Sequence, residues 1–241
     1  MTASHPSPPT LLQRLRATFE RTRESGANLP PEPVLASDLG VSRPQLREAL
    51  ARLEGEGLIA RRSGAGTVVN TEALDIRTWL SQQEPFIETL RRAGLADASI
   101  ELLSIRFRAM TGDEAAYFGR PSGCGMLDVR KRWRAGGRVH MLADYQVPVP
   151  GARGLSDISA PDDPIFDVAA RVHGAPPAWE IAHTRAETAD ARLAGDLETD
   201  PGSPLLILDL LGVSTKGLRL YRTREHHIGN AVDYGFVRTF R

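Results

Sequence analysis

Apolar and polar positions alternate in the first 70 residues in a way that predicts three short helices and a β-hairpin. Apolar residues recur at helical spacing at residues 11–19, 34–39 and 46–53. Gly40 stands where a helix-turn-helix needs a tight turn, because glycine adopts positive φ at little cost. Two short β-rich runs, 58–62 and 67–69, flank a glycine-rich tip. This order predicts a winged helix-turn-helix.

The third predicted helix begins with residues suited to DNA. Ser42 and Gln45 have capping-box spacing, and Pro44 falls in the first turn, where a missing N–H costs nothing. Arg43, Gln45 and Arg47 project from the N-terminal turn, the part of a recognition helix that meets base edges. A solvated surface is the plain alternative for a single arginine. The predicted DNA-binding residues are Ser42, Arg43, Gln45, Arg47, Arg62, Ser63, Gly64 and Gly66.

Beyond residue 98 the pattern becomes β-rich. Gly136-Gly137 marks a hairpin between two strands. Strands in succession with a few helices predict an α+β domain around an antiparallel sheet. The expected strands are 100–110, 126–135, 139–147, 179–188, 205–213, 217–226 and 232–240, and the expected helices are 113–118, 164–173 and 189–197. The predicted organisation is a disordered tail at 1–9, a DNA-binding domain at 10–70, a linker with a helix at 71–98 and a second domain at 99–241.

Composition adds modest constraints. The chain has 241 residues. Its 30 Lys and Arg equal its 30 Asp and Glu in number, so the net charge gives no indication of a nucleic-acid partner. The single cysteine, Cys124, excludes an intramolecular disulfide and suits a reducing compartment. With neither an apolar run long enough to span a membrane nor a signal-peptide core, the expectation is a cytoplasmic protein without a membrane partner.

The second half of the chain lacks the usual marks of catalysis. It has no glycine-rich phosphate loop and no metal-binding motif of known spacing. His226 and His227 are neighbours on an expected strand, so they point to opposite faces and cannot easily chelate one metal. Cys124 has no partnered base, which favours an incidental thiol over a nucleophile. We therefore expect no enzyme activity, no metal and no cofactor.

One cluster of arginines favours an anionic ligand. Arg130, Arg132 and Arg134 alternate along one expected strand and share a face with Asp128. Guanidinium groups match phosphate and carboxylate, which predicts an anion pocket. The alternative is a sheet face on which local acids pair with the arginines.

The N-terminal motifs resemble the DNA-binding domain of the GntR family of regulators. The resemblance covers about residues 10–70 and is specific; it implies that residues matching Ser42, Arg43, Pro44, Arg47, Ser63 and Gly64 lie at the operator. Many members have Ser where Pro31 stands and Thr where Pro44 stands, so Pro44 is expected to contribute only helix geometry. The motifs that carry the resemblance are 29-LPPE-32, 40-GVSR-43, 46-LREAL-50, 56-EGLI-59 and 64-GAGTVV-69.

The second half resembles the UTRA effector domain of the HutC branch of that family, whose fold is similar to chorismate lyase. The resemblance runs from about residue 100 to 240, is fainter, and includes a short likeness of 142-LADY-145 to phosphonate-utilisation regulators. Relatives that bind amino-sugar phosphates carry Ser where Pro85 and Pro164 stand, so that ligand is not expected. The effector-binding residues that the resemblance implies are Arg132, Arg134, Asp144, Tyr221, Thr223 and His227.

The expected function is a ligand-responsive transcription repressor. We expect a homodimer that reads a palindromic double-stranded DNA operator, because two-fold symmetry doubles the few base contacts of one winged helix. The expected effector is a small anion such as a phosphonate, phosphate ester or carboxylate. Two alternatives are a chorismate-lyase-like enzyme with an attached DNA-binding module, which turnover of a candidate anion would reveal, and an architectural DNA binder, which predicts little ligand response.

Overall fold

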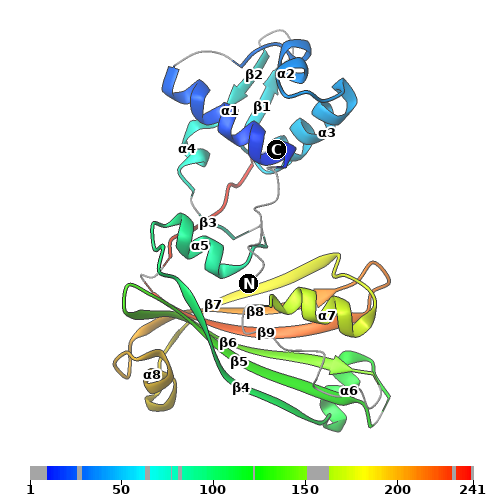
Figure 1. Cartoon of the computed structure of the whole chain (residues 1–241), viewed down its shortest axis with the longest axis vertical. Helices are drawn as coiled ribbons and strands as arrows, with labels where there is room; N and C mark the ends of the chain where they lie inside the picture. Colours follow the sequence, from blue (N-terminus) through cyan, green and yellow to red (C-terminus); the bar gives the residue numbers. More distant parts are fainter. Residues whose placement is uncertain are drawn as a thin grey trace, which may run out of the picture. The chain divides into compact units, whose positions relative to one another are not determined.

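The computed structural model of the chain divides into two compact units (Figure 1). Unit 1 comprises Met1–Ser81 and Tyr234–Arg241, and unit 2 comprises Gln82–Asp233. The structure describes residues 10–25, 29–62, 66–76, 78–80, 83–121, 123–150, 163–229 and 232–239.

Unit 1 is a winged helix-turn-helix, as predicted. Its buried core joins the first three helices to the base of the hairpin, with Phe19, Leu46 and Leu53 fully covered. The strands of the hairpin pair antiparallel from Ile59 and Val69 outwards. Its elements are α1 (Leu11–Ser25), α2 (Glu32–Asp38), α3 (Arg43–Gly55), β1 (Ile59–Arg62), β2 (Gly66–Val69), α4 (Thr71–Leu74), β3 (Thr78–Trp79) and β10 (Tyr234–Gly235).

The local signals in the sequence explain the helix-turn-helix. Gly40 has φ 59°, the left-handed conformation that the turn between α2 and α3 requires. Ser42 caps α3, and its side chain and that of Gln45 form a reciprocal capping box. Val41 packs against the core of the unit, and its N–H donates to Ala36 O at 3.0 Å. The turn is thus fixed by backbone geometry, a cap and one apolar contact.

Unit 2 is an α+β domain around one antiparallel sheet, also as predicted. Its six strands have the order β4-β5-β6-β9-β8-β7 (Figure 1). The Gly136-Gly137 hairpin between β5 and β6 is present, with φ 56° and 72°. The elements are α5 (Phe86–Arg92), β4 (Ser99–Ala109), α6 (Gly112–Phe118), β5 (Gly125–Ala135), β6 (Arg138–Val149), α7 (Ile165–His173), β7 (Trp179–Thr188), α8 (Ala191–Leu197), β8 (Pro204–Val213) and β9 (Arg219–Ile228).

The sheet of unit 2 has two different faces. On the α7 face, apolar side chains such as Val129 and Trp133 of β5 pack with α5 and α7 into the main core of the unit. On the α8 face, a smaller core joins Leu142 of β6 to Leu197 of α8. Alternate residues of a strand point to opposite faces, so each residue of β5, β6 and β9 can be assigned to one of them.

One expectation about the C-terminal part of the chain is wrong. The described residues 232–239 do not form a strand of the main sheet, because only Tyr234 and Gly235 are extended and they pair in parallel with Thr78 and Trp79. The helix expected within 71–98 is present as α5, which begins at Phe86. The predicted boundaries at 70, 98 and 241 differ from this grouping, in which unit 1 extends to Ser81 and takes in residues from Tyr234 onwards.

Candidate functional site

The N-terminal turn of α3 presents exposed polar side chains. Arg43 and Arg47 are both exposed, and the side chain of Arg47 is 68% accessible. Arg47 Nε donates to Glu32 Oε2 of α2 at 2.8 Å, and the bond raises the pKa of the guanidinium. Both arginines remain predicted DNA contacts, and the carboxylate holds Arg47 in place at the surface.

Gln45 and Ser42 are engaged in the cap of α3. Gln45 Oε1 accepts from Ser42 N at 3.0 Å and lies 2.8 Å from Ser42 Oγ. Ser42 Oγ also accepts from Gln45 N at 3.4 Å. The carboxamide oxygen of Gln45 is therefore committed to the helix start, which leaves its NH₂ group as the part able to meet a base or phosphate.

The wing, which is the hairpin of β1 and β2, is bound to α3 by an ion pair. Arg61 donates from Nε and Nη2 to Glu54 Oε2 at 2.8 and 2.6 Å, while Arg61 N donates to Glu54 Oε1 at 3.0 Å. These bonds hold the pKa of Glu54 below its usual value. Gly66 has φ 82°. Of the other predicted wing contacts, Ser63, Gly64 and the side chain of Arg62 lie outside the described residues.

The six predicted effector residues do not meet in one place. Strand alternation and pairing put three on each face of the sheet. The α8 face carries Arg132, Arg134 and Asp144, and the α7 face carries Tyr221, Thr223 and His227.

On the α8 face, Arg132 and Arg134 are bound by acids of the chain. Arg132 Nε lies 2.6 Å from Glu101 Oε2, and its Nη1 lies 3.2 Å from Glu198 Oε1. Arg134 Nη1 lies 2.5 Å from the same Glu198 oxygen. Glu198 ends α8 in the left-handed conformation with φ 53°. The alternative of local pairing thus describes this arginine pair, with Glu101 and Glu198 in place of Asp128.

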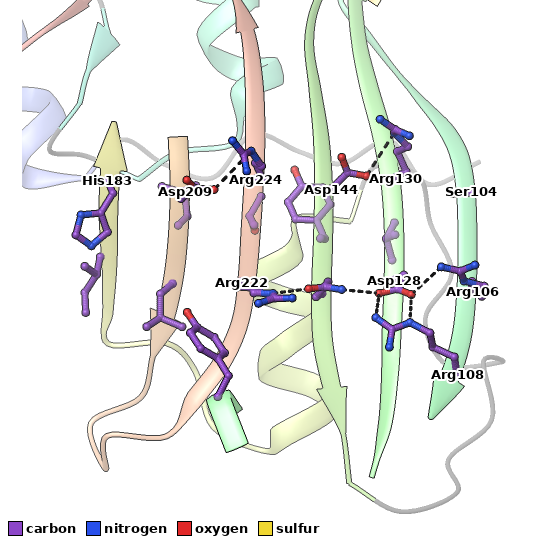
Figure 2. A pocket seen from close by; sticks show the side chains of 18 of the residues that line it. Ser104, Arg106, Arg108, Asp128, Arg130, Asp144, His183, Asp209, Arg222 and Arg224 are labelled. Carbon is purple, nitrogen blue, oxygen red and sulfur yellow. Dashed lines mark hydrogen bonds and ion pairs between the residues drawn. The ribbon is translucent and has the colours of Figure 1, made fainter. Parts of the chain in front are cut away.

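A cavity of about 940 Å³ lies on the same face (Figure 2). Figure 2 shows Arg130 turned to Asp144, at 3.3 Å, and Arg106 and Arg108 both turned to Asp128. The Arg and Asp residues that line the cavity are Arg106, Arg108, Arg130, Arg185, Arg192, Arg222, Arg224, Asp128, Asp144 and Asp209. Among the described residues that line it, two are predicted effector residues, Asp144 and Thr223, whereas Arg132 and Arg134 are not part of this lining.

The α7 face carries a buried cation. Lys131 is 5% exposed, although lysine is rarely buried without a role. Its Nζ donates to Asp163 O at 2.8 Å and lies 6.0 Å from the centre of the Tyr145 ring. In the sheet, Lys131 is opposite Ala143, and Ala143 is opposite Glu225. An ammonium and a carboxylate therefore flank a residue whose side chain is a single methyl group.

The predicted residues of the α7 face surround this pair. Thr223 is opposite Tyr145 in the sheet, and its Oγ1 is buried with no hydrogen-bond partner among the residues that the structure describes. His227 Nε2 lies 3.0 Å from Glu225 Oε2. Such an unpartnered buried hydroxyl costs free energy unless something binds to it.

Burial also changes the ionisation of this face. Tyr221 donates a hydrogen bond to Glu180, and burial raises the pKa of both groups. Burial likewise raises the pKa of Tyr145. Both phenols are therefore neutral at physiological pH, and Tyr221 uses its single hydroxyl proton in the bond to Glu180.

The residue pattern of β5 already indicates that the side chain of Lys131 lies on the covered face of the sheet. Val129 and Trp133 flank it at alternate positions, so their common face is the covered one. Arg130, Arg132 and Arg134 then belong to the other face. The two adjacent histidines do point apart: His226 faces Asp144, and the ring of His227 meets that of Phe86 edge to face. Among the described residues, no group of three or more His, Cys, Asp or Glu could hold a metal.

Comparison with protein families assigns both units. The model described as "Bacterial regulatory proteins, gntR family" matches residues 11–69. The model of the UTRA domain matches residues 95–233, more than half of the chain. No helix within the described ranges is both long and apolar enough to cross a membrane.

Two curated relatives are regulators of Escherichia coli strain K12. The putative L-lactate dehydrogenase operon regulatory protein is 40% identical over 113 residues, which are 45% of this chain and 42% of the relative. The probable transcriptional regulator PhnF is 31% identical over 148 residues, 59% of this chain and 60% of the relative. The chain thus spans less than two thirds of the length of either relative.

Solved structures show the same fold over nearly the whole chain. PhnF from Mycobacterium smegmatis has a TM-score of 0.60 at 22% identity, covering 94% of this chain and 99% of that one. YydK from Bacillus subtilis, described as a possible transcriptional regulator, has a TM-score of 0.71 at 14% identity, covering 95% and 99%. The chain belongs to the GntR family of bacterial regulatory proteins and carries a UTRA domain behind its winged helix-turn-helix.

Proposed function

We propose that the protein is a ligand-responsive transcription regulator that binds double-stranded DNA through α3 and the wing. The observation that carries this proposal is the exposed arginine pair, Arg43 and Arg47, at the capped start of α3 in a winged helix-turn-helix. A recognition helix contacts base edges with these first residues. The relatives described above are named as regulators and not as enzymes, which supports the same function. Because its target is DNA, we place the protein in the cytoplasm.

The proposed regulator is a homodimeric repressor of a palindromic operator. One α3 helix reaches few base pairs, and a two-fold axis doubles the contacts and imposes an inverted repeat. In this scheme, the ligand lowers operator affinity because it favours one arrangement of the dimer over another.

The proposed effector is a small anion bound on the α7 face. Lys131 supplies the positive charge, and Thr223 supplies a buried hydroxyl group that has no hydrogen-bond partner among the described residues. Glu225, on the other side of Ala143, is placed to accept from an ammonium or hydroxyl group of the same molecule. Arg132 and Arg134 were the expected anion ligands, but their pairing with Glu101 and Glu198 favours a structural role.

A thermal-shift screen tests this proposal. A ligand that binds only the folded protein raises the melting temperature. Phosphonates, phosphate esters and carboxylates are screened against the wild type, Lys131→Met, Arg130→Ala and the double variant Arg132→Ala/Arg134→Ala. We expect a hit that Lys131→Met loses and the double variant keeps. Loss in Arg130→Ala with retention in Lys131→Met would move the ligand to the cavity of the α8 face, and the absence of any hit would contradict an anionic effector.

A further inference from the structure

The segment 234–239, which we call the return segment, is part of the DNA-binding unit although it follows the sensor domain in sequence. Tyr234 and Gly235 pair with Thr78 and Trp79 of β3, and Leu80 N donates to Gly235 O at 3.1 Å. Trp79 itself is 7% exposed and belongs to the core beneath α1 and α3. The pairing therefore attaches the return segment to the buried part of this unit.

Val237 of the return segment packs against the same core. It lies directly over Gly57, because a Cβ atom built on Gly57 would be 2.5 Å from Val237 Cγ1. Gly57 also has φ 75°, a conformation that favours glycine. The position thus requires glycine for two reasons, its backbone and the valine above it.

Gly57 is the joint between the recognition helix and the wing. α3 ends at Gly55, and β1 begins at Ile59. Across the hairpin, Asn70 Nδ2 donates to Gly57 O at 3.0 Å and Asn70 N donates to Leu58 O at 2.9 Å. The direction in which the hairpin leaves α3 is therefore set at Gly57, where Val237 packs from the return segment.

We infer that Val237 is a positioning residue for operator binding, which holds the wing at its angle to α3. The inference rests on the proposed function, since it requires the wing to contact DNA. Val237→Ala removes the methyl group that covers Gly57, Cγ1, and frees the joint, so the wing loses contacts to phosphates while α3 keeps its own. Phe236, the neighbour of Val237, is 59% exposed and offers a matched control.

The test measures how DNA affinity depends on salt. Each lost phosphate contact makes the slope of log K against log salt concentration shallower by about 1, whereas a smaller folded fraction leaves the slope unchanged. The full chain, Val237→Ala and Phe236→Ala are titrated with a duplex of the promoter region upstream of the gene. Circular dichroism checks the fold, and because Val237 is only partly buried, the variant is expected to fold.

We expect Val237→Ala to bind about fivefold more weakly or worse, with a shallower slope, and Phe236→Ala to match the wild type. Wild-type affinity and slope in Val237→Ala would overturn the inference. A weaker affinity with an unchanged slope would also overturn it, since the valine would then only stabilise the fold. If the wild type itself does not prefer the promoter duplex over unrelated DNA, the proposed function fails instead.

Discussion

Arg47 of α3 and Glu32 of α2 form an exposed ion pair, with Nε and Oε2 2.8 Å apart. An exposed pair of this kind contributes little to stability. We expect the pair instead to hold the Arg47 guanidinium beside the start of α3 in the DNA-free protein. A phosphate or guanine can replace the carboxylate, because both accept from the same nitrogen atoms.

Arg47→Ala is expected to weaken operator binding strongly. A lost base or phosphate contact costs about 1–3 kcal/mol, and a dimer loses it twice. Fluorescence anisotropy with the promoter duplex measures the change. Arg52→Ala, at the other end of the same helix and paired with Glu56, is the control and is expected to bind within about twofold of the wild type.

Glu32→Gln provides the complementary test. It removes the negative charge that competes with DNA for Arg47, so operator affinity is expected to stay equal or rise. If Glu32→Gln binds as poorly as Arg47→Ala, the ion pair itself is needed, and Arg47 is not the contacting group.

The oligomeric state follows from the proposed reading of an inverted repeat. Light scattering at micromolar concentration is expected to give the mass of two chains, and a footprint is expected to cover two half-sites about one helical turn apart. A single-chain mass, with and without DNA, would rule out the palindromic operator. Randomising the sequence of one half-site is expected to weaken operator binding, because one of the two α3 helices then loses its base contacts.

Stability at low pH is expected to depend on Glu114. A side-chain hydrogen bond from Arg108 is the main cause that lowers the pKa of Glu114 to about 2, from an ordinary value of 4.5. Because the folded-state pKa is depressed, this pair stabilises the fold above pH 4.5 and the contribution is lost as the pH falls towards 2.

Thermal unfolding across this pH range checks the expectation. Glu114→Gln is expected to melt at a lower temperature than the wild type at pH 7, with the difference shrinking towards pH 2. Glu88→Gln, at an exposed position of α5, controls for the loss of one surface carboxylate. A gap between Glu114→Gln and wild type that does not change with pH would show that the lost contact is not ionic.

Local signals predicted most elements because each has a local cause. The Ser42–Gln45 spacing gave a capping box, and the Gly136-Gly137 pair gave the hairpin. Alternation in β5 gave a shared face for Arg132 and Arg134. The alternation alone did not show whether the arginine face is the covered one. The apolar neighbours of Lys131 show that the opposite face is covered.

The return segment could not be predicted in this way. Tyr234 and Gly235 pair with β3, which lies more than 150 residues earlier, and only two residues on each strand take part. Two paired residues are too few to produce a recognisable sequence periodicity. The longer stretch 232–240 has the residue pattern of an ordinary strand, which hid the short pairing. The contact of Val237 with Gly57 is equally distant in sequence and rests on the fold alone.

The location of the sensor site is tested most directly by comparing the two faces of β5 in one assay. Promoter binding is titrated with the anion found in the thermal-shift screen, for wild type, Lys131→Met and Arg132→Ala/Arg134→Ala. We expect the anion to weaken promoter binding of the wild type and of the double variant by about 5–150-fold, the usual range of allosteric coupling. Lys131→Met is expected to bind the promoter normally and to ignore the anion. A full response in Lys131→Met, with the response lost in the double variant, would contradict this account.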